Sequence, residues 1–230
     1  YADKYAVRSY VQEIIGEEYL IPLIAVYNNT DEINWELLPD QFVLKCTHGS
    51  GTNIICTDKN ELNVDEAKKK LDQWMKKSWY WYGREWPYKH IKPRIICEPF
   101  ISEDNNVPDD YKVMCFNGKA KLVQVHSDRF IDHKVDFYDT QWKRIQISGR
   151  GGVNSSNKIH TKPENFEKML QLSERITGNR AHIRIDWFIV NNNIYFGEIT
   201  FFETSGFILF DDEKDDYLLG SWIELPIKLL

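Results

Sequence analysis

The sequence predicts an α+β fold, because hairpins of antiparallel strands outnumber helices along the chain. One hairpin is expected where Asn117 and Gly118 join residues 111–116 to residues 119–126, since Asn-Gly is the strongest short-range hairpin signal. A second is expected over residues 184–200, where two β-rich runs flank three consecutive asparagines that tolerate a left-handed backbone. Further strands are predicted at residues 94–101 and 135–138.

Capping residues and apolar spacing predict three helices. The first covers residues 3–15, capped by Asp3 and ended by Gly16. The second covers residues 63–77 and starts with a pair that resembles a capping box. The third follows Pro163 and turns an apolar face inward, made by Phe166, Met169, Leu170, Leu172 and Ile176. The acidic run Asp211 to Asp216 is expected to be a solvated loop.

The composition is that of an enzyme-sized intracellular domain. The 230 residues are 42% hydrophobic, which is enough for one substantial core or for two lobes of about 100 residues each. No run of about 18 apolar residues is present, so no integral membrane segment is expected. The net charge of −6 argues against a general nucleic-acid-binding protein. Four cysteines lie in or beside predicted strands without metal-binding spacing, which indicates buried thiols in a reducing, cytoplasmic compartment: Cys46, Cys56, Cys97 and Cys115.

The asparagine-centred hairpin sets two carboxylates against each other. Counting outward from Asn192 pairs Asp186 with Glu198. It also pairs Arg184 with Thr200, and strand alternation places all four side chains on one face. Like charges opposite each other repel, so the acid pair needs a bound metal, for which Mg²⁺ fits best, or a neighbouring arginine. The other face is expected to be core, made by Ile183, Ile185, Trp187, Ile189, Tyr195, Ile199 and Phe201.

A glycine loop interrupts a predicted strand pair at residues 41–56. An alternating strand ends at Lys45 and Cys46, residues 47–52 form a small polar loop, and an apolar strand resumes at residue 54. A Walker-type loop would lead into a helix, so a P-loop NTPase is not indicated. The glycines let backbone N–H groups approach phosphates beside a strand-borne lysine. Alone the loop reads as an ordinary turn, but with the acid pair it predicts a nucleotide triphosphate site.

Five segments in order resemble a known family: Asp3-Lys4 opening a helix with Arg8, FVLKCTHGSGTNIIC, IICEPFI, DYKVMCFNG and RIDWFIV…YFGEITFFETSGF. They are similar to the ATP-grasp superfamily, and within it to the TupA-like branch of teichuronopeptide-synthesis proteins from bacterial surface polysaccharide loci. The resemblance implies two α+β lobes with antiparallel sheets that enclose ATP, residues 1–97 and 98–230. A separate N-terminal domain usually precedes these lobes and is not seen in this sequence, so we expect either that it was removed or that another protein or domain supplies its role.

The resemblance also implies an activity. ATP-grasp enzymes phosphorylate a carboxylate with ATP and Mg²⁺, and an amine then attacks the acyl phosphate. Here the product would be an amide on a uronic acid of a bacterial capsular or cell-wall polysaccharide or its precursor. The expected partners are ATP, the uronate, a small amine and a fused or separate glycosyltransferase domain. The alternatives are an ATP-grasp phosphotransferase acting on a saccharide and a glycan-binding domain without turnover.

The family motif implies a metal site and a catalytic arginine in the C-terminal part. Asp186 and Glu198 match the Mg²⁺ ligands, and Arg184 matches the arginine that steadies the transferred phosphoryl group. Many relatives carry Asn as a third ligand where this chain has Thr200. Threonine is a weaker ligand, so we expect Thr200 to act through water.

The motif likewise implies the nucleotide contacts. Lys4 and Lys45 match the two lysines that contact the phosphates. For the DYK motif the alternative is a solvated strand end. The remaining implied contacts lie in the glycine loop, the interlobe hinge and DYK: His48, Gly49, Ser50, Gly51, Thr52, Glu98, Pro99, Phe100, Ile101, Asp110 and Lys112.

Two segments are candidates for substrate binding. In VHSDRFIDH, Arg129 is predicted to hold an anionic substrate, and His126 or His133 to assist deprotonation of the amine; the alternative is a polar strand-end loop. Residues 78–94, SWYWYGREWPYKHIKPR, place aromatic rings beside cations, a combination that suits an anionic sugar. The alternative for this segment is an aromatic cluster that packs the lobes. Its cations are Arg84, Lys89 and Lys92.

Overall fold

The computed structural model describes residues 1–102, 107–128, 131–147, 153–156 and 158–225. The chain forms two compact units, the first made of Tyr1–Glu13 with Leu20–Ile101 and the second of Ile14–Tyr19 with Ser102–Leu230. Each unit contains its own antiparallel sheet with helices, so the predicted α+β class is confirmed. None of the helices in these ranges has the length and hydropathy of a transmembrane span.

The sheet of the first unit has the strand order β1-β4-β2-β3, with antiparallel neighbours throughout. Its strands are β1 Ala25–Tyr27, β2 Phe42–Cys46, β3 Asn53–Cys56 and β4 Ile95–Pro99. The helices that begin in this unit are α1 Val7–Ile15, α2 Val64–Met75 and α3 Tyr80–Gly83. Short 3-10 helices complete it: η2 Thr30–Glu32, η3 Trp35–Leu37, η4 Lys59–Glu61 and η5 Trp86–Tyr88.

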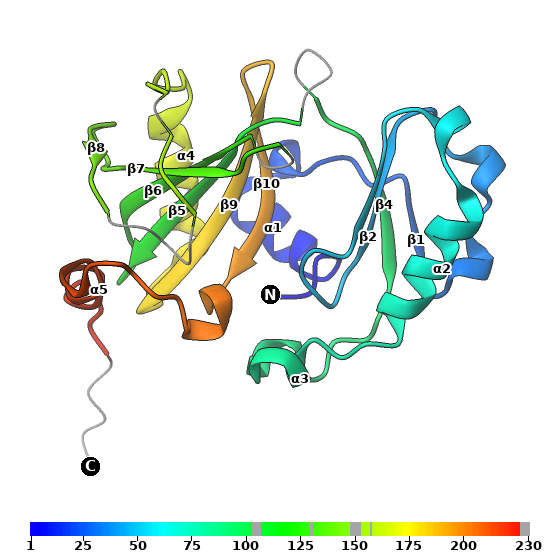
Figure 1. Ribbon diagram of the computed structural model, residues 1–230, viewed down its shortest axis with the longest axis horizontal. Coiled ribbons are helices and arrows are strands. Elements are labelled where there is room, and N and C mark those ends of the chain that lie inside the picture. The colour runs from blue at the N-terminus through cyan, green and yellow to red at the C-terminus, as the bar shows by residue number, and fades with distance from the viewer. Residues whose placement is uncertain (103–106, 129–130, 148–152, 157, 226–230) are drawn as a thin grey trace. The chain divides into compact units, whose positions relative to one another are not determined.

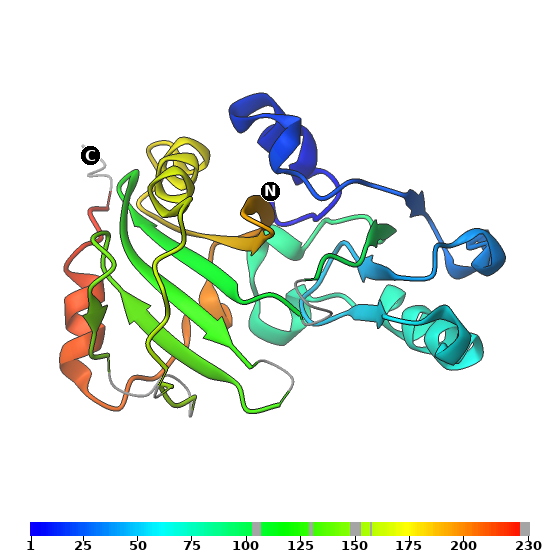
Figure 2. The same ribbon diagram turned by 90° about the horizontal axis from the view of Figure 1, so that it is seen from above.

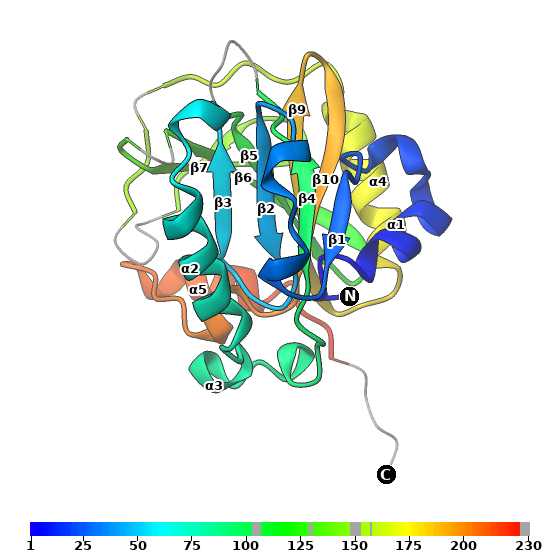
Figure 3. The same cartoon turned by 90° about the vertical axis from the view of Figure 1, so that its right-hand side faces the viewer.

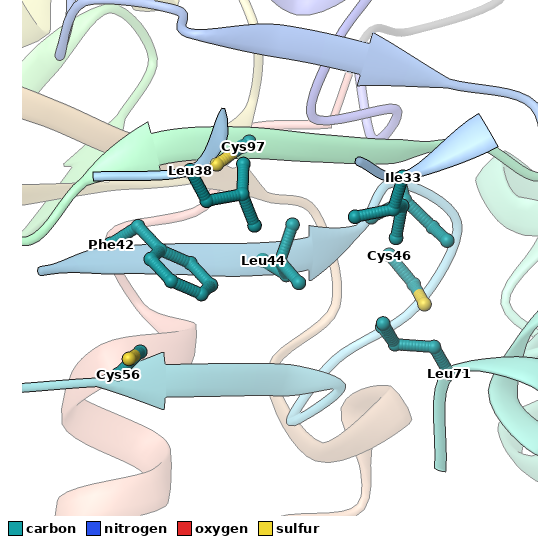
Figure 4. Close-up of a cluster of buried hydrophobic side chains, with 9 residues drawn as sticks. Ile33, Leu38, Phe42, Leu44, Cys46, Cys56, Leu71 and Cys97 are labelled. Carbon is teal, nitrogen blue, oxygen red and sulfur yellow. The ribbon is translucent and has the colours of Figure 1, made fainter. Parts of the chain in front are cut away.

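The core of the first unit lies between this sheet and helix α2 (Figures 3 and 4). Phe42 and Leu44 of β2 are fully buried and belong to one cluster with Leu71 of α2. All four cysteines of the chain are free and buried, as predicted. Burial raises the pKa of Cys46 to about 11 and that of Cys97 to about 12, so these thiols stay protonated and unreactive at neutral pH.

The sheet of the second unit has the order β10-β9-β5-β6-β7-β8 among the described residues. Its strands are β5 Asp110–Phe116, β6 Lys119–Ser127, β7 Lys134–Tyr138, β8 Arg144–Ile145, β9 His182–Val190 and β10 Asn193–Thr200. The helices are α4 Phe166–Thr177 and α5 Glu213–Gly220, with 3-10 helices η1 Glu17–Tyr19 and η6 Glu203–Gly206.

Helix α4 covers one face of the second sheet (Figures 1 and 2). Its buried residues include Phe166, Met169, Leu172 and Ile176, whereas the predicted inward residue Leu170 is only half-buried. Trp187 of β9 is fully buried on this side and donates its indole N–H to Ser173 Oγ of α4 at 2.8 Å. This face is therefore the main core of the unit.

The opposite face of the second sheet is apolar at one end and charged at the other. Met114, Leu122 and Phe137 form a buried cluster with Leu219, so helix α5 covers the apolar end. Farther along the same strands, Lys112 and Asp186 occupy paired positions. Such a division places a polar surface on a rigid sheet, where side chains can be held in fixed positions.

The predicted helices and strands are confirmed, with two corrections. The first helix begins at Val7, because Asp3 Oδ1 accepts hydrogen bonds from the Tyr5 and Ala6 N–H groups and holds a turn ahead of it. The acidic run Asp211 to Asp216 is not a loop. Asp212 caps helix α5 by accepting from the Lys214 N–H at 3.0 Å, and the following acids suit the positive end of the helix dipole.

In the hairpin of β9 and β10 the two acids pair as predicted, but the turn that sets this register is not the predicted one. The turn is Asn191 and Asn192, with φ of 48° and 62°, and Asn193 already pairs in β10. If this register continued, Glu198 would lie one position away from Asp186. A β-bulge at Gly197 shifts the register by one residue, so that Asp186 lies opposite Glu198 and Arg184 lies opposite Thr200.

The bulge also corrects the predicted core face. Ahead of it, Trp187 is opposite Phe196 instead of Gly197, and the two rings meet edge to face at 5.9 Å. Phe196 is accordingly buried and Tyr195 half-buried. The reason is the period of two: one residue of register moves a side chain to the other face.

Gly118→Ala should lower the free energy of unfolding by about 1–3 kcal/mol, because the turn requires a positive φ and close backbone approach. Gly118 has φ +80°, and a Cβ would lie 2.5 Å from the Gly178 carbonyl oxygen. Gly206→Ala is the matched control, with φ +81° and nothing within 4 Å of a Cβ. Urea unfolding of both variants separates the cost of the positive φ from the cost of the contact with Gly178. Equal losses of unfolding free energy in the two variants would show that the contact with Gly178 is unimportant.

Candidate active site

Arg184 is the centre of a charged cluster at the polar end of the second sheet. Its Nε donates to Asp186 Oδ1 at 2.6 Å and its Nη2 to Asp186 Oδ2 at 2.8 Å, so the pair is bidentate. Nη2 also donates to Thr200 Oγ1 at 3.0 Å and lies 3.6 Å from Glu198 Oε1. Nη1 donates to Glu203 of η6. One guanidinium thus contacts three carboxylates, which fixes its position.

Lys112 joins this cluster from the neighbouring strand. It pairs with Asp186 in the β5–β9 register, and its Nζ donates to Asp186 Oδ2 and lies 3.4 Å from Asp110 Oδ2. Lys112, Asp110 and Asp186 are all buried. The structure therefore brings the predicted DYK residues together with the predicted metal ligands and excludes a solvated strand end.

Electrostatics keep the pair of Arg184 and Asp186 charged at neutral pH. Burial raises the pKa of Asp186, but the charges of Arg184 and Lys112 outweigh burial and hold that pKa at about 2. Burial lowers the pKa of Arg184, and Asp186 more than compensates, so the pKa is raised. Asp186 therefore contributes stability that is present above its ordinary pKa and is lost as the pH falls toward 2.

The cluster fits a divalent cation in donor type. Four carboxylates lie around Arg184 and Lys112 in the described contacts, those of Asp110, Asp186, Glu198 and Glu203. Mg²⁺ prefers carboxylate oxygens of this kind.

The described ranges contain no group of three or more His, Cys, Asp or Glu side chains placed to hold a metal by themselves. Mg²⁺ usually takes one or two protein carboxylates and fills its remaining positions with water and phosphate oxygens. Asp186 already accepts from two cations, whereas the Glu198 side chain is 30% exposed. Of the predicted ligands, Glu198 is the one more accessible to an added cation.

Glu98 organises a second charged cluster, in the first unit. This buried carboxylate accepts from Lys45 Nζ at 2.7 Å and from Arg8 Nη1 at 2.9 Å. Arg8 comes from helix α1 and also donates to the Ile21 carbonyl at 2.7 Å. Glu98 thus holds both cations side by side. Pro99 ends β4, and Phe100 and Ile101 follow it half-buried.

The glycine loop connects β2 to β3, and residues of the first unit hold it at both sides. Lys4 Nζ donates to the Gly49 carbonyl at 2.7 Å, and the Lys4 N–H donates to the Thr47 carbonyl at 3.1 Å. On the other side, His48 Nε2 bonds the Trp74 carbonyl of α2 at 3.1 Å. Burial lowers the pKa of His48, so this imidazole is neutral and donates.

A pocket of about 230 Å³ lies under the glycine loop. Lys77 is its cationic wall, and Trp74, Trp79 and Tyr82 are its aromatic walls. The pocket is also lined by the five loop residues that the family motif assigns to the nucleotide: His48, Gly49, Ser50, Gly51 and Thr52.

A pair of histidines extends the polar face along β6. His126 Nδ1 and His133 Nε2 are 2.9 Å apart, and His126 Nε2 is 3.0 Å from Gln124 Oε1. Gln124 Nε2 in turn lies 3.4 Å from Glu203 Oε2. The predicted substrate residue Arg129 lies outside the described residues.

The sequence reasoning missed three residues of these clusters as site members. Glu203 lies in a 3-10 helix that no local sequence pattern predicted. Gln124 is fully buried opposite Lys112, a position that the strand register alone would have revealed. Arg8 lies four residues after Lys4 in the segment predicted to be helical, so its spacing was a usable signal.

The aromatic segment at residues 78–94 exposes about half of its rings. Trp81, Tyr82 and Trp86 are each more than three-fifths exposed, whereas Trp79, Tyr80 and Tyr88 are half-buried. The Arg84 guanidinium lies 4.5 Å from the Trp81 ring centroid, and Lys89 Nζ lies 4.1 Å from that of Trp86. These rings and cations form a solvent-facing surface within the first unit.

Comparison with solved structures identifies the fold. D-alanine–D-alanine ligase from Bacillus anthracis matches with a TM-score of 0.54 at 15% identity, over 86% of this chain and 56% of its own. The Helicobacter pylori enzyme of the same name matches with a TM-score of 0.53 at 17% identity, over 98% of this chain and 59% of its own. An ADP complex of N5-carboxyaminoimidazole ribonucleotide synthetase matches with a TM-score of 0.54 at 12% identity, over 90% of this chain and 46% of its own. The chain spans less than two thirds of the length of each.

Sequence comparison places the chain within that fold. A search of curated proteins found no significant match. The profile of the TupA-like ATP-grasp family, in contrast, matches residues 1–224. With a match over nearly the whole sequence, and with an ATP-grasp fold, the chain belongs to the TupA-like ATP-grasp family.

Proposed function

We propose that the chain carries the nucleotide- and metal-binding part of an ATP-dependent carboxylate–amine ligase, and that its two compact units are the lobes of the ATP-grasp fold. The observation that carries the proposal is the Arg184 cluster, whose carboxylate oxygens suit Mg²⁺ in complex with a triphosphate. Two of the three structural relatives support it, because they are named as D-alanine–D-alanine ligases, and the Bacillus anthracis enzyme has also been solved with ATP.

The residues divide into roles in phosphoryl transfer. Asp186 and Glu198 would hold Mg²⁺, with Thr200 acting through water, and the ion would neutralise charge on the phosphates. Arg184 would steady the transferred phosphoryl group, and Lys112 would contact a phosphate or the ribose. Because phosphoryl transfer needs positioning and charge neutralisation rather than covalent catalysis, no further nucleophile on the protein is required.

The first unit would supply the remaining nucleotide contacts. Lys4 and Lys45 would bind phosphates, and the glycine loop would offer backbone N–H groups to them. Glu98, with the backbone of residues 99–101 after it, would contact the adenosine. A substrate carboxylate oxygen would then attack the γ-phosphorus and ADP would leave, after which the amine would attack the acyl carbon and phosphate would leave.

For the carboxylate we propose a uronic acid of a saccharide. The exposed Trp81, Tyr82 and Trp86 support this choice, since ring faces stack on the C–H faces of sugars. Arg84 and Lys89 beside them suit a carboxylate. The bacterial polysaccharide context, the amine and a glycosyltransferase partner remain proposals that the family resemblance suggests.

Arg84→Ala should raise KM for the uronate about tenfold or more without changing kcat, because a charge-assisted contact is worth roughly 1.5–3 kcal/mol and acts on ground and transition states alike. Steady-state kinetics with varied uronate measure the effect. Lys70→Ala removes a comparable exposed cation, paired with Glu66 on α2, and serves as the control. Wild-type KM in the Arg84 variant would place the sugar elsewhere.

ATP with Mg²⁺ should stabilise the chain against heat. At a ligand concentration one hundred times Kd, linkage predicts about 2.7 kcal/mol of added stability. Differential scanning fluorimetry with ATP alone, Mg²⁺ alone and both measures the shift, and we expect the largest one with both. A melting temperature that is unchanged up to millimolar ATP and Mg²⁺ would contradict the nucleotide site.

The activity itself is tested by release of ADP. Glucuronate and galacturonate are each combined with a panel of amines, ATP and Mg²⁺, and the products are identified by mass spectrometry. The proposal predicts ADP formation that requires both carboxylate and amine, together with an amide product. A stable phosphorylated sugar without an amine requirement would instead identify a phosphotransferase, and saccharide binding without any ADP release would identify a glycan-binding domain.

A further inference from the structure

The pocket under the glycine loop lies within the first unit, on the side of its sheet that helix α2 covers. Phe42, Leu44 and Cys46 of β2 belong to the buried cluster that includes Leu71 of α2. Trp74, which forms one wall of the pocket, packs against the same cluster. The pocket is therefore on the α2 face of the sheet, near the end of that helix.

The Glu98 cluster lies on the opposite face. Lys45 is between Leu44 and Cys46 in β2, so its side chain points away from α2. There it meets Glu98, whose neighbour in β4, Cys97, belongs to the core on the α2 side. Phosphates bound by Lys45 would lie on this opposite face. The pocket is thus separate from the phosphate site proposed above, although the glycine loop borders both.

The wall of the pocket that the loop forms is held in place. Lys4 Nζ donates to the Gly49 carbonyl at 2.7 Å, and His48 Nε2 lies 3.1 Å from the Trp74 carbonyl. A Cβ at Gly49 would lie 3.3 Å from Trp79 Cε3, so the indole packs directly on the loop. Because the loop and the aromatic wall hold each other, a ligand can enter with little rearrangement, which favours affinity.

The size and the rings of the pocket suit one sugar ring. Its volume is about 230 Å³. Sites for drug-sized ligands have roughly 300–1,000 Å³, so this pocket favours a ligand of one ring over a nucleotide. Trp74, Trp79 and Tyr82 provide ring faces that can stack on the C–H faces of a sugar. The hydroxyl of Ser50 can donate or accept a hydrogen bond at the rim.

Lys77 determines the charge of the pocket. Burial lowers the pKa of His48, so Lys77 alone is charged at neutral pH among the described residues that line the cavity. Its side chain is exposed, and no carboxylate of the described ranges forms an ion pair with it. An ammonium group without an acidic partner, beside aromatic walls, favours a sugar that carries a carboxylate over a neutral one.

Tyr82 connects the pocket with the exposed aromatic surface. It lines the cavity and is 64% exposed. It belongs to the same short helix as Trp81, which is equally exposed and lies beside Arg84. A saccharide of two rings can therefore place one ring in the pocket and the next on the surface of helix α3.

We propose that this pocket binds an anionic sugar ring of the saccharide substrate, other than the ring whose carboxylate reacts. The inference rests on the proposed saccharide substrate. The ring stacks on Trp74 and Trp79, and its carboxylate meets Lys77. The reacting carboxylate belongs to another ring, because it must reach the phosphates, which the proposed function places on the Lys45 face of the sheet. The chain thereby selects saccharides of two or more rings over a monosaccharide.

Calorimetric titration of the chain with digalacturonate, galacturonate and the neutral disaccharide maltose tests the proposal without turnover. We expect digalacturonate to bind at least about tenfold more tightly than either of the others, since only it offers two rings and carboxylates. Lys77→Gln should weaken digalacturonate binding about tenfold or more, the scale of a charge-assisted contact, and leave maltose binding unchanged. Lys76→Gln is the matched control, because Lys76 is also exposed but does not line the pocket.

Tyr82→Leu tests the stacking wall. It should weaken digalacturonate and maltose several-fold alike, because ring stacking does not depend on charge. Tyr217→Leu is its control, since Tyr217 is 71% exposed on helix α5 of the second unit. Both tyrosines are exposed, so both variants should fold, and thermal unfolding verifies this.

The outcomes separate the pocket from the ligase. If digalacturonate does not bind, binds no better than maltose, or binds Lys77→Gln and Lys76→Gln equally well, the pocket assignment is overturned. ADP release that requires uronate and amine would still support the ligase in each of these cases. If Lys77→Gln and Tyr82→Leu lose affinity as expected but no combination of uronate and amine releases ADP, the pocket assignment stands and the proposed ligase activity fails.

Discussion

Glu198→Gln should lower carboxylate- and amine-dependent ADP formation at least about 100-fold, the scale of losing one electrostatic group in an active site. The reason is that an amide is a much weaker Mg²⁺ ligand than a carboxylate. The Glu198 side chain is 30% exposed and 3.6 Å from Arg184 Nη2, so removing its charge should cost at most about 1 kcal/mol of stability. Initial rates at saturating ATP and Mg²⁺, together with thermal unfolding, measure both effects.

Glu174→Gln is the matched control. This glutamate of α4 has a side chain that is 32% exposed and pairs with Lys119 at 3.0 Å, so it resembles Glu198 in exposure and pairing but does not contact the Arg184 cluster. It should keep wild-type activity. Asp186 is less suited to the test, because it is buried between Arg184 and Lys112 and its loss would also destabilise the fold. Near-normal turnover of Glu198→Gln would remove Glu198 from the metal site.

Glu98→Gln should lower the free energy of unfolding by about 3–5 kcal/mol, the usual cost of breaking a buried ion pair. The carboxylate is buried and compensates both Lys45 and Arg8, which the neutral amide would leave side by side as like charges. Urea unfolding measures the loss. ATP should recover part of it, because its phosphates would supply negative charge to Lys45.

The same substitution at Glu66 gives the comparison. Glu66 pairs with Lys70 at 2.6 Å on helix α2, and both side chains are at least half exposed. Exposed pairs of this kind contribute about 0.3–0.5 kcal/mol, so Glu66→Gln should be nearly neutral. A loss at Glu98 as small as that at Glu66 would contradict the role of Glu98 as the anchor of both cations.

The acid pair on the β9–β10 hairpin shows how much of the site can be predicted from the sequence. Alternation and the asparagines identified the hairpin and its polar face, since both signals are local. The pairing of Asp186 with Glu198 was correctly predicted, but from a three-residue turn that does not exist. Two compensating details, a two-residue turn and a bulge at Gly197, give the same result. Neither detail can be deduced from hydrophobic alternation.

The partners within the charged clusters depended on tertiary structure. Lys112, Gln124 and Glu203 meet Arg184 or its neighbours across strands and a 3-10 helix that are far apart in sequence. Spacing along one strand cannot reveal them, because strand order decides which polar faces are adjacent. The exposure of the aromatic segment was equally unpredictable, since its apolar content fits a buried cluster as well as a surface.

The fate of oxygen from the substrate carboxylate tests the central claim most directly. Glucuronate or galacturonate labelled with heavy oxygen in the carboxylate is incubated with ATP, Mg²⁺ and the amine, and the released phosphate is analysed by mass spectrometry. An acyl phosphate transfers one carboxylate oxygen to phosphate, so a ligase of the proposed kind predicts one labelled oxygen per phosphate. Phosphate without label, formed at the same rate whether or not the uronate is present, would contradict it.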